Sequence, residues 1–118
     1  MLPAANRLRK DTDIKTLFAK GKGVFDSVCG LKFRPNGLAA TRFAIVAGTT
    51  VSKRAVVRNL VRRRLREILR ARLPTLKPGF DGVLIVRKPA IDKSYVELEK
   101  IVDSVLKRSP LIGFVKKV

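Results

Sequence analysis

The sequence has very little of several residue types on which enzymes depend. It contains no histidine and no tryptophan, one cysteine (Cys29), and nine acidic residues. Without histidine there can be no histidine general base and no histidine-containing zinc site, and one cysteine can complete neither a four-cysteine site nor an intramolecular disulfide. The nine carboxylates are scattered, whereas a two-metal nuclease needs several that converge. The chain by itself therefore has the composition of a binding protein rather than of a self-sufficient catalyst.

Long apolar segments and phosphate-binding loops are also missing. No run approaches the roughly 20 apolar residues of a membrane-spanning helix, and Arg42 interrupts the longest candidate, residues 38–51. The apolar start of the chain reaches Arg7 and Arg9 too soon for a secretory signal peptide. No Walker or Rossmann glycine-rich loop is present, and the lack of a disulfide fits a reducing compartment. We therefore expect a cytoplasmic protein with no membrane and no small-molecule substrate.

An excess of basic residues is the strongest bias in what the sequence does contain. The 27 lysines and arginines against 9 aspartates and glutamates give a net charge of +18 in 118 residues. A fold does not need this excess, because much of it repels itself, so we expect a polyanionic partner. The basic residues are spread through segments with folded patterns, which favours nucleic acid over a membrane surface. The length predicts one domain, residues 1–118.

The most basic segment is a helical pattern from about Ala55 to Leu73, with apolar residues at the three-and-four spacing of one buried face. Its other side is basic, with Arg58, Arg62, Arg66 and Arg70 every four residues, Arg63, Arg64 and Arg72 beside them, and only Glu67 to offset them. Like charges at this spacing repel each other, and a polyanion would relieve the repulsion. The alternative is a solvated amphipathic face. We favour phosphate binding because a solvated face usually mixes glutamate with its cations.

The remaining segments predict a layered domain in which helices cover a sheet. Residues 11–13, Asp-Thr-Asp, are typical of the cap of a short helix that ends at about Lys20. Strand patterns follow over residues 24–33, 43–46 and 82–86, and the last is a continuous apolar run that indicates a central strand. Ser94 and Glu97 have the spacing of a capping box for a helix that runs to about Arg108.

A few side chains outside the arginine-rich helix allow two interpretations each. Phe18 could stack on a base, but from the pattern alone packing in the core beside Leu17 explains it better. Arg87 and Lys88 follow the central strand, where functional side chains often lie, yet a solvated strand end explains them equally well. Cys29 lies in a strand pattern and is expected to be a small buried residue.

Four places in the sequence resemble the bacterial ribonuclease P protein subunit. The signature is Arg58-Asn59 followed by Arg62-Arg63 and Arg66-Glu67. Residues 6–18 are similar to the amino-terminal segment and first helix of the family. Residues 51–57 are similar to the segment that leads into the signature helix, and residues 86–90 are similar to the end of the fourth strand. The arginine–asparagine helix is specific to the family when it is joined to the Arg-Lys-Pro element at residues 87–89.

The resemblance implies an αβββαβα sandwich, a two-layer α/β fold whose central mixed sheet includes a left-handed βαβ crossover, as in the second domain of ribosomal protein S5. It implies an accessory subunit of an endoribonuclease, whose RNA subunit removes the 5′ leader from precursor tRNA using Mg²⁺ held mainly by that RNA. The protein would bind the catalytic RNA and the leader, and would raise the affinity for substrate and magnesium.

The resemblance also assigns residues to these roles. The residues that would contact the RNA subunit are Arg58, Asn59, Arg62, Arg63 and Arg66, and those of the leader cleft are Phe18, Lys53, Arg87 and Lys88. No residue is assigned to catalysis or to a metal. The sequence departs from the family at Leu60, where an arginine is usual, at Ile14, where an aromatic residue is frequent, and at residues 47–50, which lack the usual lysines.

Two other functions share part of this evidence. A ribosomal or general structured-RNA-binding protein would have the same charge without contacts to a leader. A free-standing nuclease would cut RNA alone, which the missing histidine and the scattered acids disfavour. Stimulation of a catalytic RNA at low magnesium, sedimentation with ribosomes, and cleavage by the protein alone separate the three.

Overall fold

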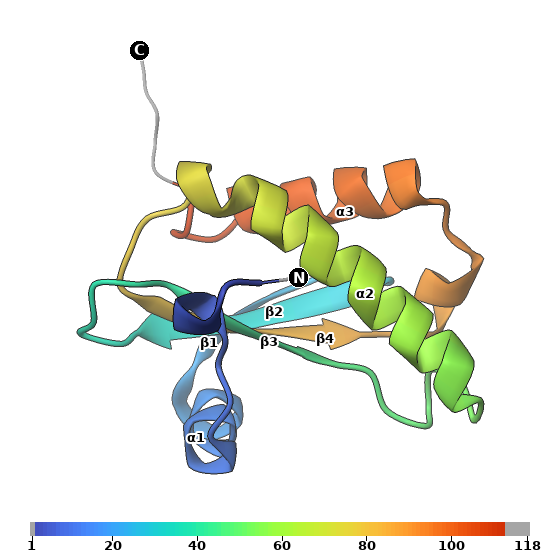
Figure 1. The fold of residues 1–118 in the computed structure, drawn as a ribbon, viewed down its shortest axis with the longest axis horizontal. Helices are drawn as coiled ribbons and strands as arrows, with labels where there is room; N and C mark the ends of the chain where they lie inside the picture. The colour runs from blue at the N-terminus through green and yellow to red at the C-terminus, as the bar shows by residue number, and fades with distance from the viewer. Residues whose placement is uncertain (1, 113–118) are drawn as a thin grey trace.

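The computed structural model describes residues 2–112, which form three α-helices, four strands and three short 3₁₀ helices (Figure 1). The α-helices are α1 (Asp11–Lys20), α2 (Ala55–Arg72) and α3 (Tyr95–Lys107), the strands are β1 (Lys22–Phe25), β2 (Cys29–Pro35), β3 (Arg42–Val46) and β4 (Phe80–Val86), and the 3₁₀ helices are η1 (Ala4–Asn6), η2 (Leu73–Thr75) and η3 (Lys88–Asp92). The order of helices and strands confirms the predicted αβββαβα arrangement. Within these residues no helix has the length and apolarity needed to cross a membrane.

The strands form one mixed sheet in the order β1-β2-β4-β3. β2 is antiparallel to both β1 and β4, whereas β3 is parallel to β4 and is connected to it through α2. The mixed sheet is as predicted, and the hand of this crossover stays a prediction. Val46 pairs with Ile85 and Cys29 pairs with Val86, so the ends of β3 and β4 and the β1–β2 turn lie together. We call this the carboxyl end of the sheet.

The two faces of the sheet are covered unequally (Figure 1). α2 and α3 lie on one face, and their apolar residues join those of β2, β3 and β4 in the main core. α1 lies on the other face, where only Leu8, Leu17 and Val83 form a small buried cluster. Four partly buried residues border that cluster: Ile14, Ala44, Val46 and Ile85. We call this second face, together with α1, the α1 face.

Residues 24–33 do not form the single strand that the sequence pattern predicted. The chain reverses at residues 26–28, between β1 and β2, because Asp26 makes a local turn. Its carboxylate Oδ1 accepts a hydrogen bond from the backbone N–H of Val28 at 3.0 Å, and its own N–H donates to the Cys29 carbonyl at 2.9 Å. Asp side chains often compete with the strand ladder in this way. The result is a hairpin that places β1 at the edge of the sheet.

The predicted cap of α1 is also wrong. Lys10 occupies the N-cap position and makes no side-chain cap bond, and Asp11 and Asp13 lie inside the first turn, where the helix dipole favours negative charge. Asp13 lies 3.6 Å from the Arg42 guanidinium, which in turn forms a two-pronged ion pair with the buried carboxylate of Asp81. The hydrogen bond to Asp81 raises the pKa of Arg42. This chain of charges fixes the start of α1 to the sheet.

The start of α3 confirms the predicted capping box. The Ser94 hydroxyl accepts a hydrogen bond from the Glu97 N–H at 3.1 Å, and the Glu97 carboxylate accepts one from the Ser94 N–H at 2.9 Å. The hydrogen bond from the Ser94 backbone lowers the pKa of Glu97. The box therefore fixes where α3 begins, directly after η3 and the end of β4.

Candidate nucleic-acid interface

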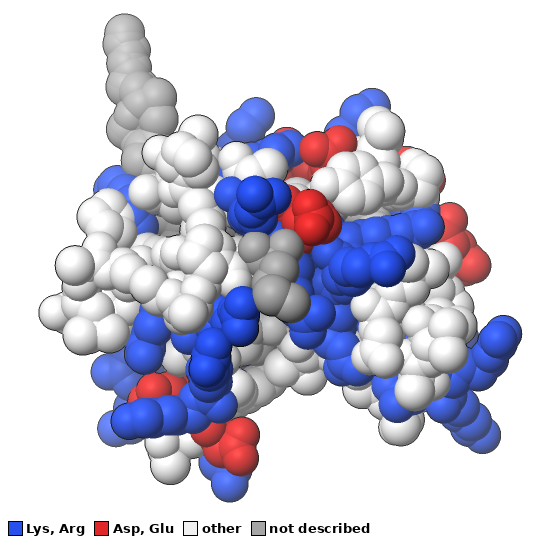
Figure 2. Space-filling view, in the orientation of Figure 1, with Lys and Arg blue, Asp and Glu red and all other residues white. Residues whose placement is uncertain are grey.

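α2 separates its apolar and basic residues as the sequence predicted. Its buried side chains are Val61, Leu65, Ile68 and Leu69, which pack into the main core. On the other side lie Arg58, Asn59, Arg62, Arg63 and Arg66, which we call the arginine face. Asn59 and Arg63 are exposed and the other three are half-buried. Figure 2 shows basic side chains gathered along this helix, with only isolated acidic side chains among them.

Two residues of the arginine face also hold the loop that follows β3. Arg58 donates from Nη1 to the Ser52 carbonyl at 2.8 Å, and Arg62 donates from Nη1 to the Ala47 carbonyl at 3.2 Å. Arg62 further donates from Nη2 to the Asn59 side-chain oxygen at 2.8 Å. A guanidinium has five N–H donors, so both arginines keep donors for phosphate while their planes are fixed. The loop that lacks the family's lysines is thus attached to α2 through its backbone.

A shallow groove of about 650 Å³ runs along the exposed side of α2. Its lining residues are Val56, Asn59, Leu60, Arg63, Arg66 and Glu67. Leu60, which stands where the family usually has an arginine, contributes apolar surface here beside Val56, a residue that is 73% exposed. The departure at Leu60 therefore exchanges one cation for apolar surface and leaves Arg63 and Arg66 on the groove.

Arg72 does not widen the arginine face as the sequence pattern suggested. Its Nε donates to Asp103 at 2.7 Å and its Nη2 donates to Glu99 at 3.2 Å, and both acceptors belong to α3. The hydrogen bond to Asp103 is the main reason why the pKa of Arg72 is raised. Arg72 thus joins α2 to α3 on the side away from the groove. Helical spacing predicted correctly that Arg72 belongs to α2. It could not predict that Arg72 pairs with acidic residues of α3, which lie far away in the sequence.

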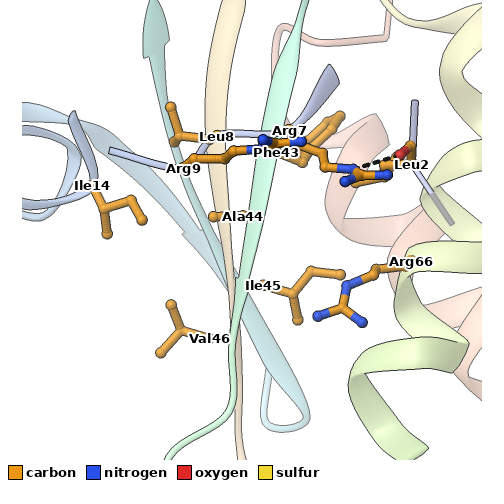
Figure 3. A pocket seen from close by; sticks show the side chains of 10 residues that line it. All are labelled: Leu2, Arg7, Leu8, Arg9, Ile14, Phe43, Ala44, Ile45, Val46 and Arg66. Atoms are coloured by element: carbon orange, nitrogen blue, oxygen red, sulfur yellow. Dashed lines mark hydrogen bonds between the residues drawn. The ribbon is translucent and has the colours of Figure 1, made fainter. Parts of the chain in front are cut away.

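A second groove, of about 440 Å³, passes around the outer edge of β3 (Figure 3). Arg66 and Ile45 line it on the side of α2, whereas Leu8, Ile14 and Val46 line it on the side of α1. Arg9 also borders this groove. Because Arg66 lines both grooves, the arginine face and the α1 face are connected around the edge of the sheet. Neither Arg9 nor Val46 was predicted from the sequence to belong to a site, and only the resemblance drew attention to Ile14.

Phe18 lies on the α1 face and not in the core, so the packing alternative is wrong. The residue is 41% exposed, whereas the neighbouring Leu17 is 1% exposed. Lys32 of β2 holds this end of α1, because its Nζ donates to the Phe18 carbonyl at 2.7 Å and lies 5.9 Å from the centroid of the Phe18 ring. An exposed ring beside a lysine can offer stacking and charge to the same nucleotide.

The other residues predicted for the leader cleft gather at the carboxyl end of the sheet. Arg87 directly follows β4, and its guanidinium carbon lies 6.0 Å from the centroid of the Phe25 ring. Lys88 begins η3, which packs against α2, and Lys53 lies in the loop before α2, so both come from segments that meet this end. All three cations are exposed. Figure 2 shows the surface hollowed between α1 and the segment that leads into α2.

In the described part of the chain, the acidic side chains near these surfaces do not converge on one site. Asp26 lies at the carboxyl end of the sheet and Asp81 near the opposite end, where Arg42 and Asn36 hold its carboxylate. In the range 2–112, no three histidine, cysteine or acidic side chains gather to hold a metal ion. Cys29 is buried as predicted, and burial raises the pKa of its thiol to about 12. The surface offers cations, rings and hydrogen-bond donors, which suit RNA binding.

Comparison with known proteins identifies the fold and the family. The protein component of ribonuclease P from Picosynechococcus sp. is 37% identical over 94 residues, which cover 80% of this chain and 81% of the relative. The RNase P protein from Thermotoga maritima, solved in complex with 1-(4-fluorophenyl)-2-thiourea, is 31% identical, with a TM-score of 0.80 over 87% of this chain and 99% of that one. The Staphylococcus aureus RNase P protein is 23% identical and supports the fold alone, with a TM-score of 0.84 over 92% and 98% of the two chains. The family model described as Ribonuclease P matches residues 2–109, and the chain therefore belongs to the ribonuclease P protein family.

Proposed function

We propose that this chain binds the RNA subunit of ribonuclease P through the arginine face and the 5′ leader of precursor tRNA along the α1 face. One observation carries the second half of this proposal. An exposed ring, Phe18, lies on a half-covered sheet face, and the exposed cations Lys53, Arg87 and Lys88 come from segments at the carboxyl end of that sheet. Rings and cations on one surface bind single strands with little sequence preference. A leader, which varies among tRNA precursors, is such a strand.

The arginine face suits a folded RNA better than a single strand. Its members are hydrogen-bond donors, and two of them are fixed by the loop after β3, so they present a rigid array to phosphates. No ring is among the residues of the α2 groove. Binding there would depend on phosphate spacing and on salt, as expected for contact with a structured RNA subunit.

We propose further that the RNA subunit performs the cleavage and holds most of the Mg²⁺. Residues 2–112 contain no set of acidic or cysteine side chains that fits a metal ion, so no side chain of this chain is assigned to magnesium. The protein would act by binding: by holding the leader it raises the affinity for precursor tRNA, and its positive charge reduces the magnesium needed. The cytoplasm remains the predicted location.

Cleavage of precursor tRNA at low magnesium tests this function. A bacterial catalytic RNA is assayed with the protein, without it, and against a control of protein alone. We expect stimulation by the protein and no cleavage in the control. Tight RNA binding without stimulation, also with the cognate RNA, would favour a general structured-RNA-binding protein. Cleavage in the control would favour a nuclease.

A further inference from the structure

Phe25 is an exposed aromatic residue whose ring packs on two glycines of the sheet. The residue is 49% exposed, and it lies on the α1 face at the carboxyl end of β1. Two glycines lie beneath it. A Cβ atom at Gly23 would lie 2.6 Å from Cε2 and Cζ of the Phe25 ring. A Cβ atom at Gly30 would lie 2.6 Å from Cδ1, at the opposite edge of the same ring. The ring therefore spans both glycines, and any side chain at either position would push it away.

Two arginines contact Phe25, one at its ring and one at its backbone carbonyl. The Arg87 guanidinium carbon lies 6.0 Å from the ring centroid, at the outer limit of a cation–π contact. Arg108, just after α3, donates from Nη1 to the Phe25 carbonyl at 3.3 Å and so attaches the end of β1 to the rest of the fold. A flat base between a ring and a guanidinium needs a separation of about 7 Å, two stacking contacts of ~3.5 Å each. A movement of Arg87 by about one ångström opens this space.

The position of Phe25 continues the surface proposed for the leader. Phe25 pairs with Gly30 and Lys32 pairs with Gly23, so Phe25 and Lys32 are diagonal neighbours on the same face of the sheet. Lys32 in turn lies against Phe18. The face thus carries a ring, a lysine, a second ring and Arg87 in succession. Isolated exposed apolar side chains are common and need no function. Phe25 differs from them, because cations lie on both sides of it and its ring packs on two glycines.

We propose that Phe25 is a second stacking platform in the leader site, on which one unpaired nucleobase of the leader lies, with Arg87 closing over the base. This inference rests on the proposed leader binding and extends it to a residue outside the arginine-rich helix and the first helix. The ring supplies the apolar contact and Arg87 supplies both charge and the second plane of the sandwich. Stacking of this kind accepts any base and favours the larger face of a purine.

The test compares variants of Phe25 in holoenzyme reconstituted with a bacterial ribonuclease P RNA. Phe25→Leu removes the ring but keeps apolar volume, Phe25→Trp keeps a ring, and Gly30→Ala keeps Phe25 but forces its ring off the sheet. Leu38→Ala is the matched control, because Leu38 is 51% exposed and lies beyond the other end of β2. Binding is measured for long-leader precursor tRNA, short-leader precursor tRNA and mature tRNA, and thermal unfolding of each variant verifies the fold.

We expect Phe25→Leu and Gly30→Ala to weaken binding of the long-leader precursor by about tenfold, the effect of removing one stacked base from its platform. Mature tRNA binding should be unchanged, and Phe25→Trp and Leu38→Ala should bind as the wild type does. A leader with 2-aminopurine at successive positions adds a direct readout. Its fluorescence should be quenched at one position by the wild type and by Phe25→Trp, and not by Phe25→Leu.

Four results would overturn the inference, and the last of them would also overturn the proposed leader site. If Phe25→Leu binds all three RNAs as the wild type does, or if quenching persists in that variant, Phe25 is not a platform. If Phe25→Leu weakens mature tRNA binding as much as precursor binding, its role is structural or general. If the wild type binds long-leader, short-leader and mature tRNA equally well, the proposed leader site fails and the platform fails with it.

Discussion

The two faces of the sheet differ in how completely they are covered. On one face, α2 and α3 bury a continuous core that includes Leu31 of the sheet and Leu106 of α3. On the other, α1 buries only a cluster around Leu17 and Val83, and Ile85 and Val46 are left partly exposed beside it. A small domain gains stability by burying apolar surface, so a half-covered face lowers that gain. Cations and exposed rings border the uncovered part, as the proposed leader site requires.

The two proposed RNA surfaces also differ from each other in the chemical groups that they present. The arginine face consists of hydrogen-bond donors, two of which, Arg58 and Arg62, are fixed by backbone carbonyls of the loop after β3. The α1 face adds exposed rings, Phe18 and Phe25, to its cations. Binding to the first surface should depend steeply on salt and little on base identity, whereas binding to the second should keep a stacking component at high salt. Variants of each surface should therefore have separable effects.

The largest effect is expected at the arginine face. Replacing Arg63 and Arg66 together by alanine should weaken binding of the RNA subunit about 100-fold, because each charge-assisted hydrogen bond contributes ~1.5 kcal/mol. The slope of log affinity against log salt should also become shallower by about 0.7–0.9 for each phosphate that the variant no longer neutralises. Filter binding over a range of salt concentrations measures both.

The matched control for this pair carries the same reduction of charge on α3. Lys100 and Lys107 are exposed residues on that helix, and replacing both by alanine removes two cations that line neither of the two grooves. It should change RNA-subunit affinity by less than about threefold, since exposed charges that do not contact the RNA are largely screened. If both double variants weaken binding equally, net charge rather than the arginine face governs binding.

A smaller and more selective effect is expected at the carboxyl end of the sheet. Replacing Arg87 and Lys88 by alanine should weaken binding of precursor tRNA about tenfold, because two cations that neutralise phosphates of a single strand are removed. Binding of mature tRNA and of the RNA subunit should stay as in the wild type. Titration of reconstituted holoenzyme with both tRNAs measures this, and equal weakening for the two would count against the leader assignment.

Arg72 distinguishes a basic residue that stabilises the fold from one that binds RNA, because it lies on α2 but is paired with acidic residues of α3. Arg72→Met should lower the free energy of unfolding by about 1 kcal/mol, the usual size for a partly exposed ion pair, and leave RNA affinity unchanged. Urea denaturation of Arg72→Met, Asp103→Asn and the double variant measures the coupling. Additive effects would show that the ion pair between Arg72 and Asp103 contributes nothing, and a lower RNA affinity would return Arg72 to the binding surface.

The smallest effect concerns Cys29, which is buried in the main core. Burial raises the pKa of this thiol from near 9 to about 12. The neutral thiol in the fold therefore contributes stability that is fully present below pH 9 and is lost as pH rises from 9 towards 12. Alkylation of native Cys29 near pH 8 should be much slower than in urea. Equal rates in the two conditions would show that the thiol is accessible in the fold.

Elements with local signals were predicted correctly from the sequence. The apolar spacing of α2, the capping box of α3 and the apolar run of β4 each lie within one segment, so periodicity and capping chemistry suffice to find them. The turn at Asp26 was missed because its residues fit a strand pattern in which Gly30 looked like the irregular position. The α1 cap was missed because the acidic residues start one position inside the helix.

Features that depend on distant pairing could not be found in this way. Arg72 and Asp103 are 31 residues apart in sequence, and Phe25 meets Arg87 only because β2 pairs with both β1 and β4. The groove around β3 combines the amino-terminal segment with Arg66 of α2. The residues that contact one another were present in the sequence, but the register that joins them comes from the tertiary fold. Only the resemblance groups Phe18 with Arg87, and this grouping stays a prediction.

Site-directed crosslinking tests the central claim, that two surfaces of this chain bind two different RNAs. A photo-crosslinker is attached to Asn59→Cys on the arginine face and, separately, to Lys88→Cys at the carboxyl end of the sheet, while the buried native thiol of Cys29 stays unmodified. Each variant is assembled with ribonuclease P RNA and precursor tRNA and irradiated. We expect the probe at position 59 to crosslink the RNA subunit and the probe at position 88 to crosslink the leader. Crosslinking of both probes to the same RNA, or the reverse pairing, would contradict the account.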